Sequence, residues 1–248
     1  MNIIAIIPSR YASTRLPAKP LADICGKPMV QHVVEQAKRS VLITEVIVAT
    51  DDERIAAAVR AFGGSVVMTP EEIQSGSDRI AFVAKEMHAD IVVNIQGDEP
   101  LIDPLLIDQT IRALLDDPKA VVATAVKPTS SHQDVFNPNV VKVALDTNGY
   151  ALYFSRSPIP YVRDAHKDEE WFKGTVFYKH FGIYVYRAPF LQLYTTLPQT
   201  PLEIAEKLEQ LRILEHGHTI KCVVTEYESH PVDTPEDLLK VIHLLQSR

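Results

Sequence analysis

Short apolar runs alternate with segments of helical periodicity through the first half of the chain. Residues 3–7 and 90–95 are almost continuously apolar, as in strands that are buried on both faces of a sheet. Between them, apolar residues such as Met29, Val33 and Ala37 recur at helical spacing. This alternation is typical of a mostly parallel sheet covered by helices, with residues 90–95 at its centre. We therefore predict an α/β fold.

The pattern changes in the second half of the chain. Residues 140–153 alternate over shorter distances around a Thr-Asn-Gly turn, which predicts an antiparallel hairpin. Residues 163–178 are charged and aromatic without periodicity, and we expect a mobile loop or part of a lobe there. Residues 179–186 predict a strand on which His180 and Tyr184 share one face, and such a polar row usually faces solvent. The second half should therefore add a smaller antiparallel lobe.

Start signals mark two helices in the second half. Thr200 opens a capping box that Glu203 completes, and we predict one helix over residues 200–216. Thr234 is the expected cap of the last helix. Asp233 then lies just outside that helix and is available to a ligand.

Composition bounds the functions that the chain can have. With 248 residues, 46% hydrophobic content and no repeat or linker, it can bury a large core as a single domain. Its net charge of -7 argues against general affinity for nucleic acid or anionic membranes. No segment approaches the roughly 20 apolar residues of a membrane span, and we expect a cytoplasmic protein. Cys25 and Cys222 are expected to be small buried hydrophobes.

A cationic loop directly follows the first predicted strand. Arg10, Arg15 and Lys19 are spaced through it among hydroxyls and prolines, with no acid between them. Such a loop gathers positive charge and backbone donors at a strand end, where a polyphosphate can be held. Charge alone predicts an ordinary solvated basic loop equally well.

Two acids are candidate ligands for a hard metal ion. Asp98 follows the central strand, at the sheet edge where the cationic loop should also lie. Mg²⁺ prefers one or two carboxylates together with phosphate oxygens and water, so Asp98 and Asp233 are candidates. The structural alternatives are a turn or N-cap acid for Asp98 and a pre-cap acid for Asp233.

Several common catalytic motifs are missing from the sequence. It contains no G-x-x-x-x-G-K-[ST], no G-x-G-x-x-G after the first strand, no C-x-x-C or H-E-x-x-H, and no G-x-S-x-G. What remains favours phosphoryl chemistry that depends on positioning and charge stabilisation rather than on a covalent intermediate.

Eight segments together resemble one known family. They read P-S-R-Y-A-S-T-R-L-P-A-K-P-L (8–21), A-T-D-D (49–52), S-G-S-D-R (75–79), Q-G-D-E-P (96–100), Y-F-S-R-S-P-I-P (153–160), K-H-F-G-I-Y (179–184), E-K-L-E-Q-L-R (206–212) and V-D-T-P-E-D-L (232–238). Their sequence and order resemble the 3-deoxy-manno-octulosonate (Kdo) cytidylyltransferases. The chain departs from the family at Ala12 and Ala18, where glycine is common, so a positive φ is not assured there.

The resemblance implies a Rossmann-like nucleotidyltransferase fold and an activity. CTP and Kdo would react to give CMP-Kdo, a lipopolysaccharide precursor, and pyrophosphate, with Mg²⁺ as cofactor. Residues 1–130 would mainly bind the nucleotide, and residues 131–248 would mainly bind the sugar and form a homodimer. The alternatives are a cytidylyltransferase for sialic acid and a regulatory module that binds nucleotide without catalysis.

The resemblance also implies roles for individual residues. The catalytic residues would be Arg10, Arg15, Lys19 and Asp98. The nucleotide would contact Pro8, Ser9, Arg10, Arg15, Lys19, Ser75, Asp78 and Arg79. The sugar would contact Gln96, Arg156, His180, Tyr184, Glu209 and Gln210, with Arg156 as partner of the Kdo carboxylate. Asp98 and Asp233 would hold the Mg²⁺ ion.

Overall fold

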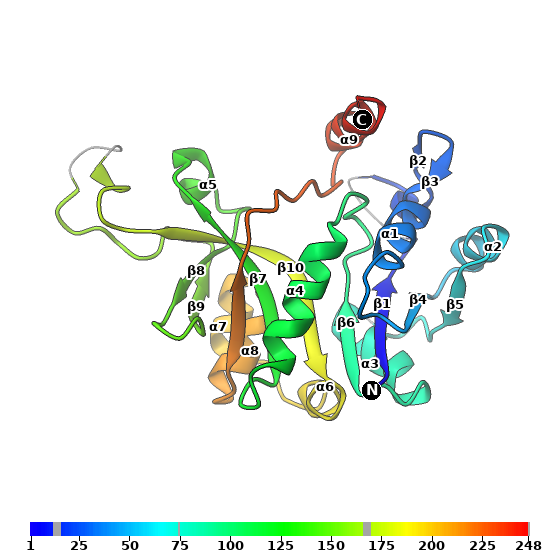
Figure 1. Ribbon diagram of the computed structural model, residues 1–248, viewed down its shortest axis with the longest axis horizontal. Coiled ribbons are helices and arrows are strands. Elements are labelled where there is room, and N and C mark those ends of the chain that lie inside the picture. The colour runs from blue at the N-terminus through cyan, green and yellow to red at the C-terminus, as the bar shows by residue number, and fades with distance from the viewer. Residues whose placement is uncertain (12–15, 74, 166–169, 248) are drawn as a thin grey trace.

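Nine strands form one mixed sheet in the computed structural model, which describes residues 1–11, 16–73, 75–165 and 170–247 (Figure 1). The strands of the sheet are β1 (Ile3–Pro8), β4 (Glu45–Thr50), β5 (Ser65–Met68), β6 (Ile91–Asn94), β7 (Val122–Thr129), β8 (Lys142–Leu145), β9 (Ala151–Ser155), β10 (Phe177–Arg187) and β11 (Ile220–Val224). A separate small hairpin pairs β2 (Asp23–Ile24) with β3 (Lys27–Pro28).

The strand order is β11-β7-β10-β6-β1-β4-β5. Strands β6, β1, β4 and β5 run parallel to one another, and β10 lies antiparallel between β6 and β7. Strand β6 is therefore central and its four residues are buried, as its apolar sequence predicted. The prediction of a mostly parallel, Rossmann-like α/β sheet is confirmed.

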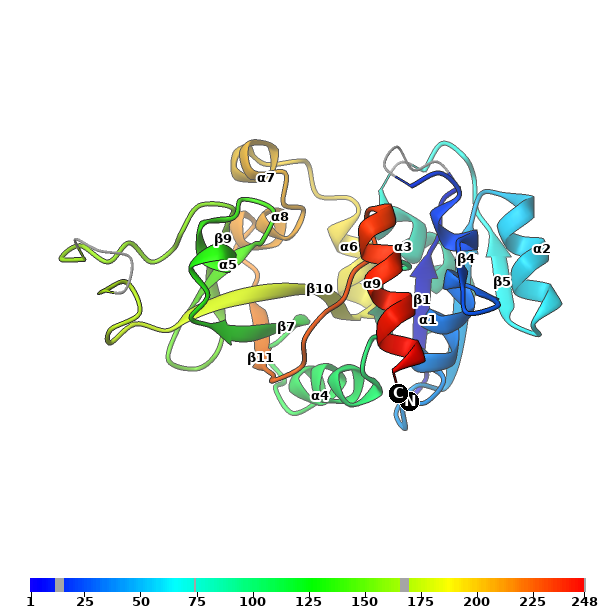
Figure 2. The ribbon, with the colours of Figure 1, turned by 90° about the horizontal axis from the view of Figure 1, so that it is seen from above.

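Helices cover both faces of the sheet. Their bounds are α1 (Met29–Ala37), α2 (Glu53–Ala61), α3 (Gly76–Glu86), α4 (Pro104–Leu115), α5 (His132–Phe136), α6 (Ala188–Tyr194), α7 (Pro201–Glu206), α8 (Gln210–Glu215) and α9 (Pro235–Gln246). Helices α1, α2 and α4 contribute to one apolar cluster, and α3, α6 and α8 to another. Figure 2 shows α4 on one side of the sheet and α7 and α8 on the other. No helix in the described part of the chain is long and apolar enough to cross a membrane.

An antiparallel lobe extends from the second half of the chain, as predicted. Strands β8 and β9 form the expected hairpin, whose turn uses Gly149 at φ 79°. Strand β8 also pairs with β10, so the lobe and the parallel part share one continuous sheet. Residues 166–169, within the segment for which we expected a mobile loop or part of a lobe, lie outside the described residues.

The helix predicted over residues 200–216 is wrong as a single element. Thr200 and Glu203 do form the predicted capping box, but α7 ends at Lys207, which takes a left-handed φ of 54°. Arg212 of α8 then donates to Glu203 of α7 at 2.7 Å, so α8 packs back against α7. The break places residue 209 at the start of a new helix rather than on the side of a long one.

One smaller prediction also differs. Cys222 is buried as expected, but Cys25 is exposed at a left-handed turn with φ 53°. The polar row on β10, for which a solvated face was one of two interpretations, does not face solvent. His180 and Tyr184 are partly buried, because the hairpin and α8 cover this part of the strand.

Candidate active site

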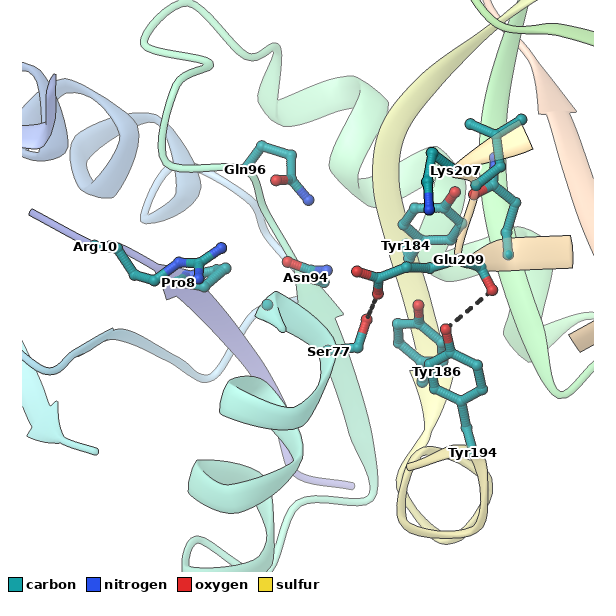
Figure 3. Close-up of a pocket in the computed structure, with 13 residues that line it drawn as sticks. Pro8, Arg10, Ser77, Asn94, Gln96, Tyr184, Tyr186, Tyr194, Lys207 and Glu209 are labelled. Carbon is teal, nitrogen blue, oxygen red and sulfur yellow. Dashed lines mark hydrogen bonds between the residues drawn. The ribbon is translucent and has the colours of Figure 1, made fainter. Parts of the chain in front are cut away.

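A pocket of about 330 Å³ opens at the carboxyl ends of β1 and β6 (Figure 3). Its lining residues come from the ends of these strands, the start of α3, strand β10, the end of α6 and the break between α7 and α8. They are Pro8, Arg10, Gly76, Ser77, Asn94, Gln96, Tyr184, Tyr186, Tyr194, Lys207, Leu208, Glu209 and Gln210. Both halves of the chain therefore build one site.

The pairing of β6 with β10 sets the floor of the pocket. Asn94 is the direct partner of Tyr184 in this antiparallel pair, so both side chains stand on the same face of the sheet. Asn94 is 4% exposed, and its Oδ1 has no hydrogen-bond partner among the described residues. A buried acceptor of this kind, at the wall of a cavity, suits a ligand hydroxyl or a water molecule.

Three tyrosines form one wall. The ring centroids of Tyr184 and Tyr186 are 5.9 Å apart, and those of Tyr186 and Tyr194 are 6.3 Å apart. Burial raises the pKa of each hydroxyl above its ordinary value. The wall is therefore apolar and uncharged at neutral pH, with hydroxyl groups that can hydrogen-bond a ligand.

One hydrogen bond crosses the pocket between the two halves of the chain. Ser77 of α3 donates to Glu209 Oε2 at 2.7 Å, and the Tyr194 hydroxyl donates to the Glu209 carbonyl at 3.1 Å. Figure 3 shows Pro8 and Arg10 on the opposite side of the pocket from Glu209, with Asn94 between them. The helix break at Lys207 makes the Ser77–Glu209 contact possible, because Glu209 would otherwise lie on the side of one continuous helix.

Gln96 is held at the edge of the pocket by a glycine. Its Nε2 donates to the Gly182 carbonyl at 3.2 Å, and a Cβ at position 182 would lie 3.2 Å from Gln96 Cγ. A side chain at position 182 would press against Gln96 and shift it, so glycine keeps Gln96 in this position.

A lysine joins the two candidate metal ligands next to the pocket. Lys19 Nζ lies 2.6 Å from Asp98 Oδ2 and 3.0 Å from Asp233 Oδ1. Burial alone would lower the pKa of Lys19, but the two carboxylates outweigh it and raise that pKa above its ordinary value. Residues separated by up to 214 positions thus meet in one charged cluster at the end of β6, as the predicted sheet edge requires.

The cluster fits a Mg²⁺ ion that also binds a polyphosphate. The described residues contain no group of three or more His, Cys, Asp or Glu side chains that could enclose a metal on their own. Two carboxylates that converge on one ammonium group are already arranged around a cation. Mg²⁺ characteristically takes one or two such oxygens and completes its shell with phosphate and water.

The predicted nucleotide residues lie in different places. Pro8 and Arg10 line the pocket, and Lys19 lies in the charged cluster. Ser9 is buried behind the pocket, with its backbone N–H bonded to the Ala49 carbonyl. Arg15 lies outside the described residues. Ala18 takes a φ of 54°, so the loop adopts a left-handed residue there without glycine.

The residues predicted at the start of α3 have structural contacts there. Ser75 caps the helix by accepting from the Asp78 N–H at 2.9 Å. Arg79 is fully buried and donates to Asp51 Oδ2 at 2.6 Å and to the Ile73 carbonyl at 3.1 Å. Neither Ser75 nor Arg79 lines the pocket, and Ser77 reaches it instead.

The predicted sugar residues divide in the same way. Four of them line the pocket: Gln96, Tyr184, Glu209 and Gln210. The structure does not bring Arg156 and His180 to it. Arg156 donates to the carbonyls of Glu206 and Pro138, and so supports the α7–α8 break. His180 lies behind Tyr184, with Nε2 at 2.9 Å from the Thr124 hydroxyl.

The sequence interpretation missed several polar pocket residues. They are Ser77, Asn94, Tyr186, Tyr194 and Lys207. Ser77 stands inside the S-G-S-D-R segment, and Asn94 is the polar residue of an otherwise apolar strand, so both carried a signal. Tyr194 and Lys207 carried none, because their positions depend on the helix break.

We expect His180 to make stability depend on pH in the acidic range. Burial lowers the pKa of His180 to about 3. Between about pH 6.5 and pH 3 the unfolded chain therefore binds a proton at this histidine and the folded protein does not, so stability falls as the pH drops through this range. In His180→Gln this loss disappears, and the difference in unfolding free energy from the wild type changes by up to about 1.4 kcal/mol per pH unit. Urea unfolding at several values between about pH 5 and pH 7 measures this difference. The exposed His243, replaced in the same way, is the control, and a pH-independent difference for His180→Gln would contradict the expectation.

The fold and the site define a nucleotidyltransferase, and comparison gives its class. Residues 4–220 match the cytidylyltransferase family model. A 4-diphosphocytidyl-2C-methyl-D-erythritol synthase from Anaerococcus prevotii has the same fold, with a TM-score of 0.62 at 15% identity over 99% of this chain and 98% of that one.

Relatives of higher sequence identity identify the family within this class. The 3-deoxy-manno-octulosonate cytidylyltransferase of Geobacter sulfurreducens is 54% identical over 99% of this chain and 100% of its own length. That of Geobacter metallireducens is 55% identical over 99% and 98%. A solved CMP:2-keto-3-deoxy-manno-octonic acid synthetase in complex with CTP superposes with a TM-score of 0.93 at 45% identity, over 100% of this chain and 99% of that one. The chain belongs to the 3-deoxy-manno-octulosonate cytidylyltransferase family, and the resemblance seen in its motifs is confirmed.

Proposed function

We propose that this protein transfers CMP from CTP to Kdo and releases pyrophosphate, which supplies CMP-Kdo for lipopolysaccharide synthesis. One observation supports this most directly. The charged cluster of Lys19, Asp98 and Asp233 includes a residue only two positions after Gln96, which lines a polar pocket built by both halves of the chain. The relatives named for this reaction support it across the whole chain length.

The cationic loop and the cluster form the nucleotide side of the site. Arg10 and Lys19 contact the triphosphate, together with Arg15. Asp98 and Asp233 hold Mg²⁺, on which we propose that activity depends. When bound, the ion offsets charge on the phosphate oxygens and lowers the pKa of a coordinated hydroxyl. The Lys19 ammonium group lies between the two carboxylates.

The tyrosine-walled pocket forms the sugar side. Gln96, Glu209 and Gln210 bring amide and carboxylate groups to hydrogen-bond the Kdo hydroxyls. Lys207 lines the pocket on this side and complements the Kdo carboxylate. Arg156 supports this side indirectly, because its guanidinium is bonded to backbone carbonyls around Lys207.

The reaction needs alignment more than a covalent intermediate. The anomeric hydroxyl of Kdo attacks the α-phosphorus of CTP, the new P–O bond forms as the bond to pyrophosphate breaks, and the hydroxyl proton leaves to water. Cations on the loop stabilise the charge that develops on pyrophosphate, and the pocket holds the sugar in line with it. We also propose a cytoplasmic homodimer that binds neither nucleic acid nor membrane.

Pyrophosphate release tests this function. The protein is assayed with each of the four ribonucleoside triphosphates, with Kdo or sialic acid, and with or without Mg²⁺. We expect turnover with CTP, Kdo and Mg²⁺ together. Turnover with sialic acid in place of Kdo would indicate the related sugar specificity. CTP binding without turnover of either sugar would indicate a regulatory module.

A further inference from the structure

A strap of residues 225–234 joins edge strand β11 to α9 and carries Asp233. In Figure 1 it runs from the upper end of β11 across the view to α9, which lies above β6. No helix or strand forms between β11 and α9, all of whose residues are described. Asp233 is therefore held between contacts of the strap on one side and the first turn of α9 on the other.

The strap is fastened to the turn that follows β6. Tyr227 donates its hydroxyl to the Leu101 carbonyl at 3.0 Å, and the Val232 N–H donates to the Asp98 carbonyl at 2.9 Å. Between these two contacts, the Ser229 hydroxyl donates to Glu99 Oε1. The strap thus follows the same turn that carries Asp98.

Glu99 is an unusual residue for this place. Its Oε2 is buried with no hydrogen-bond partner in the described part of the chain. A buried carboxyl group that is only partly hydrogen-bonded costs stability, so the bonds that it does make suggest a role other than packing. Those bonds come from Ser229 and from the backbone of His230, both within the strap.

We propose that Glu99 is a positioning residue for Asp233, which it holds beside Asp98 by anchoring the strap through Ser229. The inference rests on the proposed Mg²⁺ site and adds a residue that does not touch the ion. Past the anchor, Val232 is fully buried with its N–H bonded to the Asp98 carbonyl, and Thr234 caps α9. Loss of the Glu99–Ser229 bond loosens the segment before Val232, which weakens the Val232–Asp98 contact and lets Asp233 move away from Asp98.

Binding of Mn²⁺ to the protein with CTP and without Kdo measures the arrangement of the site independently of turnover. Electron paramagnetic resonance measures the concentration of free Mn²⁺. We expect Ser229→Ala and Glu99→Ala each to raise the Mn²⁺ dissociation constant about tenfold, which is the size typical of groups that orient metal ligands. Glu99→Gln keeps an oxygen that accepts from Ser229 and should stay within about threefold of the wild type. In the double variant Glu99→Ala/Ser229→Ala, the two effects should not add, because both remove the same bond.

Two further variants separate this inference from the proposed metal site. Ser40→Ala removes a similar hydroxyl–carboxylate bond, to Asp108, that involves no residue of the strap or of the charged cluster, and should leave Mn²⁺ binding unchanged. Asp233→Asn should weaken Mn²⁺ binding more than any anchor variant. If Asp233→Asn has no effect, the metal site and the inference both fail. If Asp233→Asn weakens binding while Ser229→Ala and Glu99→Ala do not, or if Glu99→Gln behaves like Glu99→Ala, the inference alone is overturned.

Discussion

Asp98→Asn is expected to lower kcat by at least about 10³-fold, or roughly 4 kcal/mol of transition-state stabilisation. Asp98 stands at the end of the central strand and meets Asp233 at one ammonium group, so it has the position of a metal ligand. Asparagine keeps the size of the side chain but removes the charge that balances a divalent cation. Pyrophosphate release with saturating CTP, Kdo and Mg²⁺ measures the loss.

A nearby acid gives a matched control for this prediction. Asp103 caps α4 through the Leu105 N–H at 2.9 Å, five positions along the chain, and asparagine caps helices as well as aspartate does. Asp103→Asn should therefore keep both its fold and nearly all its turnover. If Asp98→Asn also retained near-normal turnover, the proposed metal site would be wrong.

Lys19→Met should change catalysis and metal binding in opposite directions. Loss of a charged phosphate contact should lower kcat/KM for CTP about 100-fold, near 2.7 kcal/mol. In the absence of nucleotide, however, Mn²⁺ should bind about fivefold more tightly. The ammonium group that bridges Asp98 and Asp233 competes with a cation for them, and a partly exposed ion pair is worth about 1 kcal/mol.

Two measurements check this pair of effects. Initial rates over a range of CTP concentrations give the first, and Mn²⁺ titration of the nucleotide-free protein gives the second. Lys27→Met is the matched control, because Lys27 forms a surface ion pair with Glu35 away from the site, and neither quantity should change. Weaker Mn²⁺ binding by Lys19→Met would show that the lysine supports the carboxylates rather than competing for them.

Much of the fold could be predicted because its signals are local. The apolar run at 90–95 identified the central strand, since a strand buried on both faces needs an apolar residue at nearly every position. The capping boxes at Thr200 and Thr234 marked the starts of α7 and α9 correctly, because a cap is satisfied by residues three positions away. The meeting of Lys19 with Asp98 also followed from the sheet, because parallel strands end at one edge.

The sequence by itself determined the class of fold, the family and the charged half of the site, because these depend on periodicity, caps and strand ends. Only the tertiary structure decided which residues line the pocket. The left-handed turn at Lys207 and the Glu203–Arg212 contact break a helix that looks continuous in sequence, and the break brings Glu209 to Ser77. Arg156 and His180 are polar in sequence, yet packing directs them to backbone carbonyls and Thr124. Contacts between residues 50 or more positions apart determine which way such side chains point, and no local pattern contains them.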